Sequence, residues 1–233
     1  MCIPIAQETR QSFSVRESSS GREFRFVMPG PTLSPAEWSA CLERATSGQT
    51  PSPRYLVASG SLPPGVPTDF YAQLARRAKA QGIRLVLDTS GPALAAALDV
   101  GVYMVKPSLR ELRELSGQPL TVEAQWRDAA RALVDRGAAD VVALSLGDQG
   151  ALLASAQGCW RAPVLDVQVH SATGAGDSFV AGMVWALSRG DTPGEAFRHA
   201  VAAGSAAVLS EGTGLCQRDD VLRLHGAVVM TPI

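Results

Sequence analysis

Residues 171–179 combine glycines, hydroxyls and one carboxylate at the start of a run that is typical of a helix. The stretch reads Ser-Ala-Thr-Gly-Ala-Gly-Asp-Ser-Phe and continues directly into the apolar segment 180–188. Gly174 and Gly176 leave backbone N–H groups open where a loop becomes a helix, and such an end attracts anions. Asp177 lies in the first turn, where a carboxylate can accept a proton from a hydroxyl that attacks phosphorus. The pattern therefore indicates phosphoryl transfer.

The same pattern also has an ordinary structural interpretation. Glycine-rich loops before helices are common, and an Asp in a first turn often only complements the helix dipole. On spacing alone the two interpretations are about equally favoured. The glycines form neither a Walker sequence, because no Gly-Lys-Ser/Thr follows, nor a Gly-x-Gly-x-x-Gly fingerprint after an early strand.

Composition favours one globular domain that acts on a small molecule. The chain has 233 residues, of which 46% are hydrophobic and 18% charged, so it can bury a sizeable core. A formal net charge of −1 and a pI of about 6.3 give no basic field for nucleic acid or an anionic membrane. An anionic substrate must then be held by local groups.

The cysteines and the apolar runs favour a cytoplasmic location. Cys2, Cys41, Cys159 and Cys216 are scattered, with no histidine at metal-ligand spacing, so neither a zinc site nor a disulfide framework is indicated. Reduced thiols are expected. No run is long enough to span a membrane, and the first residues lack a signal-peptide pattern.

An N-terminal hairpin and a capped helix are the first elements that the sequence predicts. Residues 13–16 and 24–27 alternate apolar and polar around a turn-rich Ser18-Ser-Ser-Gly21, as in a β-hairpin. Ser34-Pro-Ala-Glu37 then matches a capping box with Pro at the first helical position, which predicts a helix over residues 35–45.

The next part of the chain alternates between strands and helices, which predicts a parallel sheet covered by helices on both faces. Polar segments follow the strand ends, and the carboxyl ends of parallel strands share one edge of a sheet. We therefore expect residues 60–65, Asp88, 106–111 and 145–150 to meet at that edge. The predicted strands are 55–58, 83–87, 103–105 and 141–145; an antiparallel edge is predicted at 151–154 and 160–162; the predicted helices are 68–81, 92–98, 108–115, 121–136, 175–189 and 193–209, with a short one at the end.

Several sequence strings, spread over nearly the whole chain, resemble the PfkB (ribokinase-like) family of sugar kinases, most closely the branch that phosphorylates fructose 6-phosphate. The resemblance implies a ribokinase-like α/β fold with a small β-lid, a single kinase domain over residues 1–233, and a lid hairpin at about 10–28. The strings are Thr9-Arg-Gln11, Arg25-Phe-Val-Met-Pro-Gly30, Ser59-Gly-Ser-Leu-Pro-Pro-Gly65, Val105-Lys-Pro107, Leu144-Ser-Leu-Gly147, Gly174-Ala-Gly-Asp177 and Ala202-Ala-Gly-Ser-Ala206.

The resemblance also implies roles for individual residues. Asp177 is the catalytic base, Gly174, Ala175 and Gly176 form the anion hole, and Arg10 and Ser61 bind the sugar phosphate. Glu111 orders magnesium through water. The implied nucleotide contacts are Lys106, Ser108, Ser145, Gly147, Gly150, Val201 and Ser205, and the positions that match a monovalent-cation site are Ser171, Thr173, Ala207, Ser210 and Gly212.

The implied function is the ATP- and Mg²⁺-dependent phosphorylation of a phosphorylated ketohexose, most simply fructose 6-phosphate, by a homodimer that pairs its lids; the resemblance also allows K⁺. Two alternatives stay open: a 1-phosphofructokinase or tagatose-6-phosphate kinase, and a truncated homologue that only binds nucleotide. Ser108, Ala172 and Gly214 depart from the family's usual Asn, Thr and Arg. The family's first strand, its sugar-binding Asp and its Gly-Gly-rich segment have no counterpart, so we expect this chain to bind MgATP weakly and to show little or no turnover of fructose 6-phosphate.

Overall fold

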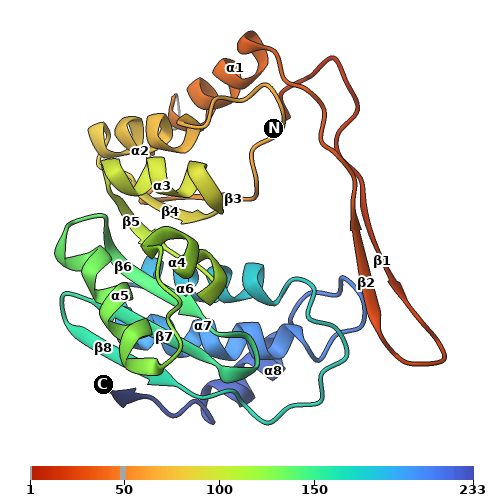
Figure 1. The fold of residues 1–233 in the computed structure, drawn as a ribbon, viewed down its shortest axis with the longest axis vertical. Helices are drawn as coiled ribbons and strands as arrows, with labels where there is room; N and C mark the ends of the chain where they lie inside the picture. Colours follow the sequence, from red (N-terminus) through yellow and green to blue (C-terminus); the bar gives the residue numbers. More distant parts are fainter. Residues whose placement is uncertain (1, 48–50) are drawn as a thin grey trace.

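The computed structural model of the protein describes residues 2–47 and 51–233, and in them a seven-stranded sheet is enclosed by two layers of helices. A separate two-stranded hairpin stands out from this body (Figure 1). The helical layers cover the two faces of the sheet, and the hairpin is a separate sheet outside them.

The order of the strands in the sheet follows the order of the chain. Four strands are parallel and three antiparallel strands follow them, so the predicted parallel sheet is confirmed for its first part. The predicted antiparallel edge was wrong in one respect, because a two-residue strand near the C-terminus pairs with Trp160 and Arg161 and becomes the edge. The strands are β3 (Tyr55–Ser59), β4 (Arg84–Asp88), β5 (Val102–Val105), β6 (Ala139–Ser145), β7 (Ala151–Ser155), β8 (Gly158–Ala162) and β9 (Thr231–Pro232).

Each face of the sheet carries its own hydrophobic core. Side chains alternate along a strand, so Leu85 and Leu87 pack into one core and Val86 into the other. Successive parallel strands are added in one direction, and crossovers of one hand place their connecting helices on the same face. That face has α1 (Pro35–Thr46), α2 (Phe70–Ala80), α3 (Gly91–Val100), α4 (Leu109–Ser116) and α5 (Glu123–Asp135), and the other has α6 (Ala175–Arg189), α7 (Pro193–Ala207) and α8 (Arg218–His225).

The hairpin confirms the first element predicted from the sequence, and one of its faces is apolar. It consists of β1 (Ser12–Arg16) and β2 (Glu23–Val27), with Phe13 opposite Phe26 and Val15 opposite Phe24. The two phenylalanine rings stack with their centroids 5.1 Å apart. All four side chains on this face are between 42% and 52% exposed, so the body of the protein does not cover them.

Most predicted helices are confirmed, with shifts of a few residues at their ends. The Ser34–Glu37 capping box is present at the start of α1, and α6 has the predicted limits. Helix α2 begins at Phe70 rather than at 68, because a turn precedes it in which the Phe70 N–H donates to the Pro67 carbonyl. Within the described residues, no helix is both long and apolar enough to cross a membrane.

Candidate active site

The carboxyl ends of the parallel strands bring the predicted segments together at one edge of the sheet. The Gly60 N–H donates to the Asp88 carbonyl over 2.9 Å, and the Lys106 N–H donates to the Leu87 carbonyl over 3.1 Å. The Ser145 N–H donates to the Pro107 carbonyl over 2.9 Å. The loops after β3, β4, β5 and β6 are therefore neighbours, as expected from the sequence.

The start of α6 presents open backbone donors and a carboxylate. Gly174 precedes the helix with φ of 80°, a left-handed conformation that side chains rarely adopt, and this turns the chain into the first helical turn. Asp177 lies in that turn and is exposed. Helix α7 supports the same turn closely, because a Cβ on Gly204 would lie 3.3 Å from the Ala175 carbonyl oxygen. The arrangement fits an anion at the end of α6.

Lys106 connects this helix start to the sheet. Its Nζ lies 3.2 Å from Asp88 Oδ1, and a Cβ on Gly176 would be 3.7 Å from the same nitrogen. The residue is only 7% exposed, so it is not an ordinary solvated surface charge. The ammonium therefore lies between β4, β5 and the glycines of α6.

Asp88 was expected at this edge of the sheet, but no role was assigned to it from the sequence. Burial raises the pKa of its carboxyl, the Lys106 ammonium opposes this shift, and the negative charges of Glu111 and Asp177 add to it. Glu111 and Asp177 are thus close enough for their charges to act on the Asp88 carboxyl, which is itself paired with Lys106. The available signal was the position of Asp88 directly after a buried Leu-Val-Leu run, at the edge where ligands bind.

Ser108 and Glu111 form a capping box at the start of α4. The Ser108 N–H donates to Glu111 Oε2 over 2.7 Å, and the Glu111 N–H donates to Ser108 Oγ over 3.3 Å. One carboxylate oxygen of Glu111 is enough to cap the helix, and this hydrogen bond fixes the Glu111 side chain at the edge of the site. Within the described residues, no three His, Cys, Asp or Glu side chains are grouped so as to hold a metal ion by themselves.

The other residues expected to contact the nucleotide lie in a turn after β6 and on α7. Gly147 is the first residue of the 3-10 turn η1 (Gly147–Gln149) after β6, Gly150 directly follows it, and the turn itself is exposed. Val201 and Ser205 lie on α7, where Val201 is 5% exposed and belongs to the core. Ser205 is half-buried, so it is the more accessible residue of this pair.

Arg10 and Ser61 meet across 51 residues of sequence, as expected for a shared ligand. Arg10 Nη1 donates to Ser61 Oγ over 3.3 Å. Ser61 also lines a pocket of about 410 Å³, to which Thr68 and Ser90 contribute hydroxyls. The Leu33 N–H donates to the Pro64 carbonyl over 2.8 Å, so the chain that follows the hairpin is attached to the same loop.

The residues expected around a monovalent cation lie partly together, and the hairpin joins them. The Ser171 N–H donates to the Val208 carbonyl, which brings the loop before α6 to the end of α7, where Ala207, Ser210 and Gly212 lie. Ser171 Oγ and Thr173 Oγ1 both donate to the carboxylate of Glu23 on β2, over 2.9 and 3.1 Å. This contact could not be predicted from local patterns, because Glu23 and Ser171 are 148 residues apart.

Comparisons with known proteins agree with this geometry. The family model described as pfkB family carbohydrate kinase matches residues 1–220. The chain is 45% identical over 221 residues to an ATP-dependent 6-phosphofructokinase isozyme 2 of Mycobacterium tuberculosis, covering 95% of the chain and 65% of that relative, which is less than two thirds of its length. It is 36% identical to a 1-phosphofructokinase of Bacillus subtilis, covering 84% of the chain and 63% of that relative. Phosphofructokinase-2 from Escherichia coli in complex with potassium superposes with a TM-score of 0.88 at 41% identity, covering 94% and 71% of the two chains.

Proposed function

Because the chain belongs to the pfkB family of carbohydrate kinases, we propose that it transfers the terminal phosphoryl group of ATP to a hydroxyl of a phosphorylated ketohexose, with fructose 6-phosphate as the substrate. The observation that carries the proposal is the position of the Lys106 ammonium beside Gly176, one residue before Asp177. Positive charge, backbone donors and a proton acceptor then occupy the same place, as phosphoryl transfer requires.

The residues of the site divide the work of this reaction. Asp177 accepts the proton of the attacking hydroxyl, and the N–H groups from Gly174 to Asp177 stabilise the transferring phosphoryl group. Lys106 balances the charge of the phosphates, and Asp88 holds the ammonium in place. The turn of residues 147–150 and the neighbouring Ser145 support the nucleotide.

The polar contact between Arg10 and Ser61 supports a phosphorylated sugar as the second substrate. A guanidinium can grip a phosphate with paired hydrogen bonds, and the Ser61 hydroxyl lies within reach of the same anion. The adjoining pocket with its Thr68 and Ser90 hydroxyls suits a polar, hydroxylated ligand. These contacts fix the phosphate end of the sugar.

The donor set also fits a divalent cation that is held together with the nucleotide. Magnesium keeps several waters and takes one or two carboxylates plus substrate phosphates, which suits Glu111 and Asp88. When bound, it supplies positive charge beside the transferring phosphoryl group. The oxygen-rich junction of residues 171–173 with 207–212 suits a monovalent cation, which its E. coli relative binds as potassium.

A substrate panel tests the proposal directly. Release of ADP is measured with fructose 6-phosphate, fructose 1-phosphate and tagatose 6-phosphate, each with MgATP. Turnover that is highest with fructose 6-phosphate supports the proposal, and a preference for fructose 1-phosphate would replace it with the activity named for the B. subtilis relative. Binding of a non-hydrolysable ATP analogue without turnover of any sugar would leave only nucleotide binding.

Replacing Arg10 is expected to affect the sugar phosphate and spare the nucleotide. Arg10→Ala removes a charged hydrogen-bond donor, so binding of fructose 6-phosphate should weaken by about 1.5 to 3 kcal/mol. Calorimetric titration with each ligand measures the difference, and Arg76→Ala on the exposed side of α2 is the control. Equal losses for both ligands would contradict a specific phosphate contact.

The apolar face of the hairpin supports a homodimer in which two hairpins cover each other. Phe13, Val15, Phe24 and Phe26 are all about half exposed, and such faces are usually buried against a partner. Phe13→Ser combined with Phe26→Ser should weaken self-association at least about tenfold, as judged from the apolar area lost. Sedimentation velocity over a concentration series measures this, with Leu222→Ser on α8 as the control; a wild-type chain that sediments as a monomer throughout would refute the dimer.

A further inference from the structure

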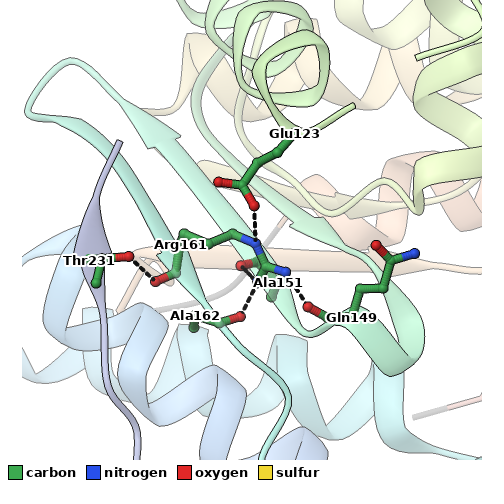
Figure 2. Close-up of polar contacts among 6 residues, drawn as sticks. All are labelled: Glu123, Gln149, Ala151, Arg161, Ala162 and Thr231. Carbon is green, nitrogen blue, oxygen red and sulfur yellow. Dashed lines mark hydrogen bonds and ion pairs between the residues drawn. The ribbon is translucent and has the colours of Figure 1, made fainter. Parts of the chain in front are cut away.

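Arg161 on β8 holds the turn of residues 147–150 through main-chain carbonyls (Figure 2). Its Nη2 donates to the carbonyl of Gln149, the last residue of η1, and its Nη1 donates to the carbonyls of Ala151 and Ala162. Its Nε donates to Glu123 Oε2 over 3.2 Å. One side chain thus joins the turn before β7, the start of β7 and the end of β8 to the first turn of α5.

The surroundings of the guanidinium make these contacts strong. The Arg161 side chain is only 14% exposed, and its charge is balanced by Glu123. Hydrogen bonds from an ionised donor are roughly twice as strong as neutral ones, and a guanidinium keeps its charge at any ordinary pH. Its flat shape allows several carbonyls to be held at fixed angles. The contacts therefore define the position of the Gln149 carbonyl.

The turn has few other restraints on its outer side. Gly147, Asp148 and Gln149 are exposed. The internal bonds of the turn run from the Gln149 N–H to the Leu146 carbonyl, from the Gly150 N–H to the Gly147 carbonyl, and from the Leu146 N–H to the Gly150 carbonyl. On its inner side the turn packs against the chain that follows β8. Gly150 has φ of 91°, and a Cβ there would collide with the Ala162 carbonyl oxygen, the same atom that Arg161 binds.

We propose that Arg161 is a positioning residue for the nucleotide: it holds the 147–150 turn in the shape that receives ATP. The inference rests on the proposed function, because it takes Gly147 and Gly150 as contacts of the nucleotide. A turn that is ordered before binding spares the ligand the cost of ordering it. Without Arg161, that cost falls on each binding event, and ordering one or two residues corresponds to a loss of about tenfold in affinity.

The test compares two identical substitutions at opposite ends of β7. Arg161→Gln removes the donors at Ala151, and Arg131→Gln removes an arginine that donates to the carbonyl of Ser155 over 3.2 Å. Affinity for a magnesium-bound, non-hydrolysable ATP analogue and for fructose 6-phosphate is measured by calorimetry for both variants. We expect Arg161→Gln to weaken the analogue about tenfold and the sugar phosphate less than twofold, with both affinities close to wild type in Arg131→Gln.

The results separate this inference from the function on which it rests. A wild-type chain that does not bind the analogue would overturn the proposed function and the inference with it. A folded Arg161→Gln variant with wild-type affinity for the analogue would overturn the inference alone, and so would equal losses for both ligands, which indicate general damage.

A second variant keeps the test decisive if Arg161→Gln does not fold. Arg161→Lys retains the charge beside Glu123 but cannot reach all the carbonyls at once. Amide hydrogen exchange should then rise in a peptide that covers residues 146–151 and stay unchanged in peptides from α6 and α7. Faster exchange spread over the whole sheet, or no change in the turn, would contradict the positioning role.

Discussion

Asp177→Asn is expected to lower turnover by about 10² to 10⁴ fold while leaving the binding of a non-hydrolysable ATP analogue nearly intact. The side chain is exposed at the start of α6, one residue after Gly176, which lies against Lys106. The substitution keeps its size while removing its basicity. The loss is therefore confined to proton transfer. A coupled assay of ADP release with fructose 6-phosphate, run beside calorimetry, measures the two effects separately.

The control for this prediction is another aspartate in a first helical turn. Asp219→Asn at the start of α8 removes the same charge from an equivalent exposed position, remote in sequence from the site. Should Asp177 only complement the helix dipole, both variants would lose a few tenths of a kcal/mol of stability and keep their turnover. Turnover of Asp177→Asn within about tenfold of wild type would end its assignment as the base.

Lys106→Met is expected to destabilise the fold and to abolish nucleotide binding. The change leaves the Asp88 carboxylate buried without its partner, which costs about 3 kcal/mol of unfolding free energy for a pair of this kind. It also removes the positive charge beside Gly176. Urea denaturation and calorimetry with the ATP analogue measure the two losses. Lys79→Met is the control, because Lys79 is the other lysine of the chain and lies exposed on α2.

A double variant distinguishes the two roles of the lysine. Lys106→Met combined with Asp88→Asn removes both charges, so most of the lost stability should return. Nucleotide binding should stay absent, since no ammonium faces the phosphates. Recovery of binding together with stability would show that Lys106 serves the fold alone.

The sequence predicted the architecture because its local signals agree with one another. Buried apolar runs of strand length alternate with helices, and capping residues such as Ser34 and Gly174 mark their starts. It missed β9, because a strand of two residues that contains a proline produces no periodic pattern. The order of the elements could therefore be predicted better than the outer edge of the sheet.

The residues of the site were predictable where a short motif carries them, and less so where the fold brings distant groups together. Asp177 and the glycines before it form one continuous motif. The burial of Lys106 depends on the register of β4 and β5, and the contact of Glu23 with Ser171 depends on the path of the hairpin. Arg161 could not be distinguished from an ordinary strand arginine, because its acceptors are main-chain carbonyls that any sequence provides.

The uncovered apolar face of the hairpin makes the order of the lid depend on the protein concentration. Glu23 attaches the hairpin to the loop before α6 on one side, while Phe13 and Phe26 lie open on the other. If a second copy covers that open face, the ordered lid is a product of association, and by mass action its population falls on dilution. The specific activity per chain would then depend on the protein concentration. A cell that makes little of this protein would hold many of its chains with the lid unpaired.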